Sequence, residues 1–366
     1  MRSCLRPVSA LLLSFTLCCY AVMSQVEGEA SCPDGLEDFI DDDGQNWCLF
    51  DIEKSGPAAL RSERMGELDS LKIKGGLDAR GAAEVAGSEF AESLVALDLS
   101  WNRFGPDGAK AVAAGKWKRL KHLNLGYCGL KTEGVETILN SPALKSLATL
   151  DLEGNGLGPE GAKVIAESNA LAWFEKLNLA NNRFGDAGVE YLAKSKSLRK
   201  AESLFLKYND ITDKGLKMLA DSPHSENLTE INLYFNIITD EGAVFIAESS
   251  DLKNLAKLDL TYNYIGDKGI TAIANSPNMR KLKWLSVYHN NVGDSGVKAI
   301  SSSGYLKNLE YLNLSQNDFG DMGIGYLAES TSLPQLKTLN VERNGLGPAG
   351  EKAMEELKAR GVEVIF

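Results

Sequence analysis

Large apolar residues recur along most of the chain in one fixed pattern, Leu-x-x-Leu-x-Leu-x-x-Asn-x-apolar. The pattern returns once after 26 residues and then every 27 residues. Apolar and polar positions alternate just before the Asn, which predicts a short strand whose apolar side chains face inward. We expect the Asn side chains to satisfy backbone groups in the following turn and to stack as a ladder. The ladder positions are Asn102, Cys128, Asn155, Asn182, Asn209, Asn236, Asn263, Asn290, Asn317 and Asn344.

The second part of each unit predicts a helix. Pro or Asp follows the turn, as at Pro106 and Asp213. Pro suits the first helical position, and Asp suits the positive end of the helix dipole. Gly stands six residues after each ladder position, as at Gly215, and we expect it to let helix and strand pack closely. Ser stands thirteen residues after most ladder positions, as at Ser222, and marks the expected helix end.

No unit of strand, turn, helix and return can bury its apolar face alone, so the units must stack. Over residues 66–366 the pattern resembles the leucine-rich-repeat family. The 27-residue unit with one helix per repeat is similar to the ribonuclease-inhibitor-like subclass, also found in the sensor arrays of NOD-like receptors. The resemblance implies an α/β solenoid, a horseshoe with parallel strands on the concave face and helices on the convex face. It leaves the ligand open, because the family binds many unrelated partners.

The ends of the chain differ from the repeats. Arg2 and Arg6 precede an apolar run at 8–23 that is too short to span a membrane, as in a secretory signal peptide. We therefore expect a secreted or extracellular protein; an uncleaved N-terminal membrane anchor is the alternative. The expected organisation is a signal peptide at 1–24, an acidic segment and cap at 25–66, repeats at 67–350 and a C-terminal cap at 351–366.

Acidic residues concentrate near the N-terminus. The chain has a formal net charge of −11, and residues 25–53 contain acids but no Lys or Arg. No basic stripe predicts nucleic-acid binding. Cys32 and Cys48 are close enough in sequence for a disulfide in a secreted protein, whereas Cys128 falls on a buried ladder position. The run at 41–44 fails the EF-hand spacing, so we predict no metal site, with an irregular calcium loop as the alternative.

Catalytic motifs are absent. The sequence has no His-Glu-x-x-His, Gly-x-Ser-x-Gly or P-loop pattern, and its three His have no ligand-spaced partners. Gly-x-Gly-x-x-Gly occurs at 156–161 and 345–350, but these glycines belong to the repeat. We predict a protein that is not an enzyme and holds no cofactor. A less favoured alternative is GTPase activation, which some arrays of the resembled subclass perform through an exposed Arg beside the ladder, where Arg103 and Arg183 lie.

The concave face carries the candidate binding residues. Four positions per unit point toward it or its rim: six, four, two and one residues before the ladder residue. Aromatic residues gather there over five units, and exposed aromatic patches mark binding sites. We predict a protein or peptide ligand, with a glycan stacked on the rings as the alternative; the rings could also merely cover the sheet. The predicted field is Phe205, Tyr208, Tyr234, Phe235, Tyr262, Trp284, Tyr288, His289 and Tyr311.

Two sequons offer glycosylation sites. Asn227 begins one of them and is the expected acceptor. Asn313 begins the other, but it lies in a recurring Asp/Asn row, four residues before the ladder, that we interpret as structural. The oligomeric state stays open.

Overall fold

The structure, a computed structural model, describes residues 37–40, 46–52, 68–168 and 174–366. The expected signal peptide, Cys32 and the run at 41–44 lie outside these residues. The predictions made for them therefore stay predictions.

The strands form one 14-stranded sheet in sequence order; β1 is antiparallel to β2, and every later neighbour is parallel. The parallel array confirms the predicted α/β solenoid. The strands are β1 (Glu37–Ile40), β2 (Asn46–Asp51), β3 (Ser70–Lys74), β4 (Ala96–Asp98), β5 (His122–Asn124), β6 (Thr149–Asp151), β7 (Lys176–Asn178), β8 (Ser203–Phe205), β9 (Glu230–Asn232), β10 (Lys257–Asp259), β11 (Trp284–Ser286), β12 (Tyr311–Asn313), β13 (Thr338–Asn340) and β14 (Glu363–Ile365).

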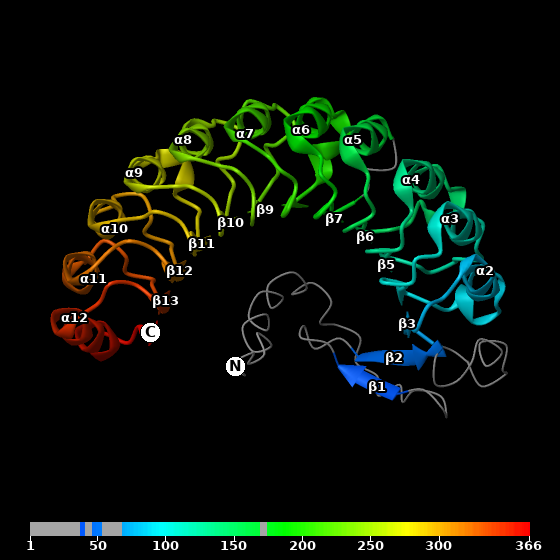
Figure 1. The fold of residues 1–366 in the computed structure, drawn as a ribbon, viewed down its shortest axis with the longest axis horizontal. Coiled ribbons are helices and arrows are strands. Elements are labelled where there is room, and N and C mark those ends of the chain that lie inside the picture. The colour runs from blue at the N-terminus through cyan, green and yellow to red at the C-terminus, as the bar shows by residue number, and fades with distance from the viewer. Residues whose placement is uncertain (1–36, 41–45, 53–67, 169–173) are drawn as a thin grey trace, which may run out of the picture.

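Helices alternate with the strands from β3 onward and form the outer layer of an open arch, whereas the strands line its inside (Figure 1). The helices are α2 (Ala79–Gly87), α3 (Gly105–Ala113), α4 (Lys131–Leu139), α5 (Gly158–Glu167), α6 (Gly185–Lys194), α7 (Asp213–Ala220), α8 (Asp240–Glu248), α9 (Asp267–Asn275), α10 (Asp294–Ser301), α11 (Asp321–Glu329) and α12 (Pro348–Ala359). Short 3-10 turns η3 (Phe90–Glu92), η4 (Pro142–Leu144), η6 (Lys196–Lys200) and η7 (Pro277–Met279) lie on some return segments.

The core lies between the strands and the helices. In the unit around β10, Leu258 and Leu260 point inward from the strand side, and Ile270 and Ile273 meet them from α9. All four side chains are fully buried. Neighbouring units repeat this arrangement, so the core runs the length of the arch as one continuous apolar layer.

The predicted asparagine ladder is present. Asn182 Nδ2 donates to the carbonyl of Leu179 in its own turn and to that of Leu152 in the preceding unit, at 3.1 and 3.0 Å. Its Oδ1 accepts from the Asn155 amide at 3.0 Å. Cys128 Sγ reaches the Leu99 carbonyl at 3.0 Å, and this thiol is buried and free. Burial raises the pKa of Cys128 to about 12, so the thiol stays protonated.

From Gly215 onward the registered Gly lies closest to an Asp of the preceding helix, and in the earlier units it lies closest to its own turn, whereas we expected close packing against the strand. Asp213 at the start of α7 accepts from the amides of Thr239 and Gly242 in the next unit, at 2.8 and 3.0 Å. A Cβ on Gly242 would lie 2.5 Å from Asp213 Oδ1. The Gly therefore leaves room for a carboxylate that joins two helix N-termini. Asp186, Asp240, Asp267, Asp294 and Asp321 make the same contacts.

The predicted Ser at the helix end forms a third ladder. Ser222 Oγ bonds the carbonyl of Ala193 in the preceding unit, and Ser249 bonds that of Ala220. Neighbouring units are therefore joined at the strand turn, at the helix start and at the helix end.

The two ends of the array differ. The β1–β2 hairpin covers the first edge of the parallel sheet, and Cys48 in β2 is disulfide-bonded. Its predicted partner, Cys32, lies outside the described residues. At the other end β14 pairs with β13, within the expected C-terminal cap at 351–366.

Candidate binding surface

The residue directly before each ladder position adopts a left-handed backbone conformation. We call these residues the rim row, because they stand where each strand turns toward its helix. Their φ values lie between 50° and 67°, and nine of the ten are not Gly. This conformation costs an L-residue roughly 1–2 kcal/mol. The rim row is Trp101, Tyr127, Gly154, Asn181, Tyr208, Phe235, Tyr262, His289, Gln316 and Arg343.

Four consecutive rings of the rim row pack against one another. The ring centroids of Tyr208 and Phe235 are 4.6 Å apart, those of Phe235 and Tyr262 5.7 Å, and those of Tyr262 and His289 4.1 Å. Tyr234 and Tyr288, one residue earlier in their units, meet these rings edge-on. We call the six residues the aromatic ribbon; it crosses four neighbouring units.

The hydroxyls of the ribbon pair across neighbouring units. Tyr208 Oη donates to Tyr234 Oη at 3.3 Å, and the hydroxyls of Tyr262 and Tyr288 are 3.1 Å apart. Burial, followed by the hydrogen bond to Tyr262, raises the pKa of Tyr288 to about 12. Burial likewise raises the pKa of Tyr234. These phenols are therefore neutral at physiological pH and present a polar but uncharged surface.

Ring edges, rather than faces, point to solvent along the stacked part of the ribbon. Phe235 lies between Tyr208 and Tyr262, and Tyr262 lies between Phe235 and His289. Phe235 is nevertheless 49% exposed. An aromatic edge carries partial positive charge and attracts electron-rich atoms such as carbonyl oxygens. The stacked rings are thus poor platforms for a flat ligand but good contacts for a polypeptide.

Trp284 and Tyr311 form a separate group, so the predicted field is not one continuous patch. Their rings stack at 5.1 Å with an interplanar angle of 4°. Lys257 Nζ lies 5.0 Å from the Trp284 ring centroid and also pairs with Glu230 at 2.8 Å. Lys257 and Tyr311 belong to the units on either side of Trp284. Both faces of Trp284 are therefore occupied.

Phe205 was wrongly predicted to be exposed. It is 8% exposed, because it occupies the inward Asp/Asn row. Side chains of that row fold back onto the turn after the strand, as Asn232 Oδ1 does when it accepts from the Tyr234 amide. A ring in the same place is enclosed by its neighbours. Phe205 therefore offers a ligand little contact.

Sequence reasoning missed two apolar residues that extend the ribbon. Ile237 and Tyr264 follow their ladder residues and are 47% and 62% exposed. They follow the ladder residue, whereas Phe235 and Tyr262 precede it. Their backbones form isolated parallel bridges to Thr212 and Thr239 of the preceding units. The repeat pattern leaves the residue after the ladder position variable. Only the presence of apolar residues there in two adjacent units could have indicated a binding surface.

A second aromatic group stands near the start of the rim row. The rings of Trp101 and Tyr127 are 3.9 Å apart and nearly parallel, and Trp101 is 65% exposed. Tyr127 Oη donates to Glu153 Oε1 and accepts from Asn181 Nδ2, both at 2.9 Å. The sequence places both rings in the predicted row, but outside the predicted field, because the Gly154 and Asn181 units separate them from Tyr208.

The inward Asp/Asn row has the structural role that we expected. Asp151 Oδ1 accepts from the Glu153 amide at 2.8 Å, and Asn178 Nδ2 donates to Asp151 Oδ2 at 2.7 Å. Burial, and then the nearby charge of Glu153, raise the pKa of Asp151 to about 6. Asn313 is 4% exposed and accepts from Ser315, so its sequon is not accessible in the folded chain.

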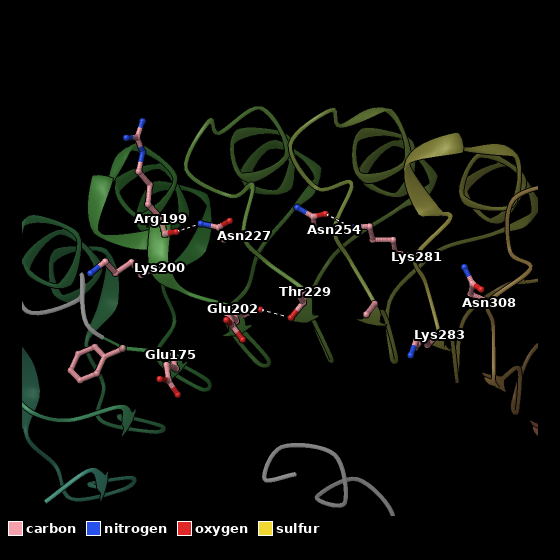
Figure 2. A pocket seen from close by; sticks show the side chains of 12 residues that line it. Glu175, Arg199, Lys200, Glu202, Asn227, Thr229, Asn254, Lys281, Lys283 and Asn308 are labelled. Carbon is pink, nitrogen blue, oxygen red and sulfur yellow. Dashed lines mark hydrogen bonds between the residues drawn. The ribbon is translucent and has the colours of Figure 1, made fainter. Parts of the chain in front are cut away.

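A polar groove of about 990 Å³ lies along the flank where the strands begin. Its side chains come from the return segments of successive units (Figure 2). Asn227, Asn254 and Asn308 each donate to a carbonyl of the preceding unit. Lys281 and Glu202 are among its charged residues, so both signs are present. Asn227, the predicted glycosylation site, is exposed here, but the groove itself is built largely from side chains that join repeats.

The glycine-rich motif at 345–350 and His122 have structural roles. Asp321 Oδ1 accepts from the amides of Gly347 and Gly350 at 2.7 and 2.9 Å, so a carboxylate occupies the place of a phosphate. Arg103 and Arg183 are exposed but stand three units apart. His122, whose pKa burial lowers to about 4, contacts Thr149. Within the described ranges we find no cluster of three potential metal ligands and no helix long and apolar enough to cross a membrane.

The repeated strand–helix units and the open arch define a solenoid of stacked repeats. The family model described as Leucine Rich repeat matches nine segments that together cover more than half of the chain: residues 91–113, 119–139, 143–166, 170–193, 202–220, 224–247, 252–274, 278–301 and 305–328. The chain belongs to the leucine-rich-repeat family. The resemblance to its ribonuclease-inhibitor-like subclass stays a prediction.

One solved structure supports the fold. An internalin (inlF) from Listeria monocytogenes superposes with a TM-score of 0.52 at 19% identity, over 87% of this chain and 86% of the internalin chain. A TDR receptor superposes with a TM-score of 0.42 at 16% identity, over 82% of this chain and half of that chain. No curated protein matches the sequence. Membership of this family supports a protein-binding role.

Proposed function

We propose that the chain is a non-catalytic extracellular or lumenal recognition protein that binds a protein or peptide through the aromatic ribbon. The observation that carries the proposal is the accumulation of six contacting rings on one rim of the concave face. Four of them occupy left-handed backbone positions that Gly or Asn would occupy at lower cost. Their bulk is not required for the core, because the ribbon lies outside it.

A protein ligand fits the chemistry of this surface better than a sugar. Sugar rings stack on open aromatic faces, but His289 stacks on Tyr262 with Phe235 tilted beside it, and Tyr311 and Lys257 flank Trp284. Exposed ring edges and neutral hydroxyls suit backbone carbonyls and mixed side chains instead. Ile237 and Tyr264 enlarge the apolar area beyond the rim. The binding surface therefore includes the turn side of the arch as well as its inside.

The test uses the full chain, secreted from a eukaryotic host and cross-linked to its neighbours at the cell surface. A captured protein is then produced separately, and its affinity is measured by calorimetry. Tyr208→Ala, Phe235→Ala and Tyr262→Ala should each weaken binding at least tenfold, as expected for aromatic anchors at an interface. Tyr305→Ala removes an exposed ring outside the ribbon and should leave the affinity unchanged.

Equal affinity of the ribbon variants and the parent chain would contradict the proposal. A glycan array provides the second arm of the test. Array binding that Tyr262→Ala abolishes would replace the protein ligand by a sugar. Retention of the whole chain in the cytosol would overturn the extracellular part of the proposal.

A further inference from the structure

Trp101 differs from the ribbon because, among the residues that the structure describes, an aromatic neighbour covers only one of its ring faces. The other face stacks on Tyr127 at 3.9 Å and 11°. Extending the β3–β4 register beyond Lys72↔Asp98 places Gly75 and Gly76 beside Trp101 and Asn102. The unit before Trp101 therefore has no side chain at the place from which each later ring of the row is covered. The resulting exposure of 65% is among the largest of the apolar residues that the structure describes.

The Trp101 ring stacks on a side chain that is itself fixed in place. Tyr127, on which it stacks, is fixed by hydrogen bonds to Glu153 and Asn181, and its ring lies so close to Gly154 that a Cβ there would be 2.4 Å from it. Trp101 itself has a φ of 67°. An indole kept in a costly conformation on a fixed support is already arranged for a flat ligand, so binding loses little conformational entropy.

Charge around Trp101 disfavours a cation as that ligand. Asp98 pairs with Lys72 at 2.8 Å, and Glu153 pairs with Lys207 at 3.0 Å. Arg103 is exposed two residues further on. A bound cation would therefore meet compensated carboxylates and a neighbouring guanidinium. An uncharged ring meets neither obstacle.

Polar groups near the indole disfavour a sugar. Recognition of a sugar requires donors and acceptors that converge on its hydroxyls. Here the Asn102 amide is committed to Ile73 and Leu99, and the Tyr127 hydroxyl to Glu153 and Asn181. A proline ring needs only the aromatic face, and Pro-rich segments dock on aromatic surfaces because their extended conformation is already formed.

The position of Trp101 links it to the ribbon. Four rim-row steps separate Trp101 from Tyr208, which is about 19 Å at the spacing of adjacent strands. An extended polypeptide spans this distance with about six residues. We propose that Trp101 binds a proline ring of the same extended segment whose other end lies on the aromatic ribbon. This inference rests on the proposed function, and it adds the direction and one residue type of the ligand.

The test uses a probe too short to reach both places. Acetyl-triproline amide is mixed with the full chain, and saturation transfer from protein to ligand is recorded by NMR. We expect transfer to the proline ring protons, loss of this transfer in Trp101→Ala, and partial retention in Trp101→Phe. Tyr262→Ala and Tyr305→Ala should leave it unchanged. Thermal unfolding of each variant verifies that the exposed substitutions leave the fold intact.

The outcomes separate the two proposals. No transfer to triproline, or equal transfer in Trp101→Ala, overturns the assignment of Trp101 and leaves the ribbon untouched. Transfer to cellotriose or binding of tetramethylammonium at Trp101, without transfer to triproline, overturns it in favour of a sugar or a cation. If triproline binds as expected but ribbon variants keep full affinity for the captured partner, the proposed function fails while the Trp101 site stands.

Discussion

The first and the later repeats close the same turn with different chemistry. In the early units α3, α5 and α6 begin with Gly at positive φ, and the amides of Gly105, Gly158 and Gly185 donate to the carbonyl of the next ladder residue at 3.0, 2.9 and 2.8 Å. From α7 to α11 the residue before the helix is extended, and its amide donates to an Asp of the preceding helix. The early version depends on a left-handed residue at the helix start, which is Gly in α3, α5 and α6 but Lys131 in α4, and the later version depends on a carboxylate.

The difference affects what the turn can display. A left-handed Gly leaves no side chain at the helix start, whereas the carboxylate version accepts Thr212 or Thr239 there and adds the isolated parallel bridges to Ile237 and Tyr264. The ribbon and its apolar extension all lie on the carboxylate-linked repeats. Trp101 and Tyr127 lie on early repeats, whose helices begin with the left-handed residues Gly105 and Lys131. Two aromatic surfaces of one row thus rest on two kinds of turn.

The largest effect on stability is expected at the Gly that stands six residues after each ladder position, and one such Gly is changed in each region. Gly242→Ala should lower the free energy of unfolding by about 3 kcal/mol, because the new Cβ displaces Asp213 from two amides. Gly134→Ala in the early region should change it by less than about 1 kcal/mol, because the nearest atom is 3.1 Å away and Ala favours the helix. Urea unfolding followed by circular dichroism measures both. Equal losses would show that the contact between Asp213 and the next helix is not what Gly242 protects.

An effect of opposite sign, and no larger, is expected when an acid of the inward row is replaced, and Asp151 and Asp259 provide the comparison. The pKa of Asp151 rises from its ordinary 3.8 to about 6, so its stabilising protonated form is complete below 3.8 and is lost as the pH rises through 6. Asp151→Asn should therefore stabilise the protein by about 3 kcal/mol at pH 7.5 and by little at pH 3.5. Burial also raises the pKa of Asp259, so Asp259→Asn should give a gain of the same sign. A pH-independent difference between Asp151→Asn and the parent chain would contradict this account.

The smallest expected effect concerns the ladder. Cys128→Asn should raise the free energy of unfolding by about 1 kcal/mol, because an amide can donate to Leu99 and accept from the early-region turn, whereas the thiol is a weak partner. The reverse change in the later region, Asn263→Cys, should be destabilising, since the Asn263 amide bonds Leu233, Leu260 and Ile238. A Cys128→Asn variant that is less stable than the parent chain would show that this turn accommodates a thiol better than an amide.

The repeat architecture could be predicted from the sequence because it follows from a pattern of residues that recurs at a fixed spacing. Leu258, Leu260 and Asn263 stand at fixed offsets in nearly every unit, so a single misassigned residue could not change the result. The same offsets predicted the ladder and the Ser at the helix end. Contacts between units are harder to predict, because Asp213 and Gly242 are far apart in sequence and only stacking shows that they meet.

The candidate site was predicted in part, for reasons of geometry. Position within a unit correctly placed Tyr208, Phe235 and His289 at the rim, where the structure leaves all three exposed. It failed for Phe205, because neighbours in the inward row enclose it, and it grouped Trp284 with a ribbon that it does not contact. Whether a ring shows its face or its edge depends on the adjacent units. That distinction, which separates Trp101 from Tyr262, is not visible in one repeat.

The spacing of the rim-row rings sets a mechanical limit on the arch. Trp101 and Tyr127 are 3.9 Å apart, and Tyr262 and His289 are 4.1 Å apart, which is close to contact distance. These rings stand on the inner, compressed side of the curve, so tighter bending would force them into one another, whereas straightening only separates them. At these two pairs the arch therefore opens more easily than it closes, and a ligand that reshapes it there would widen its span.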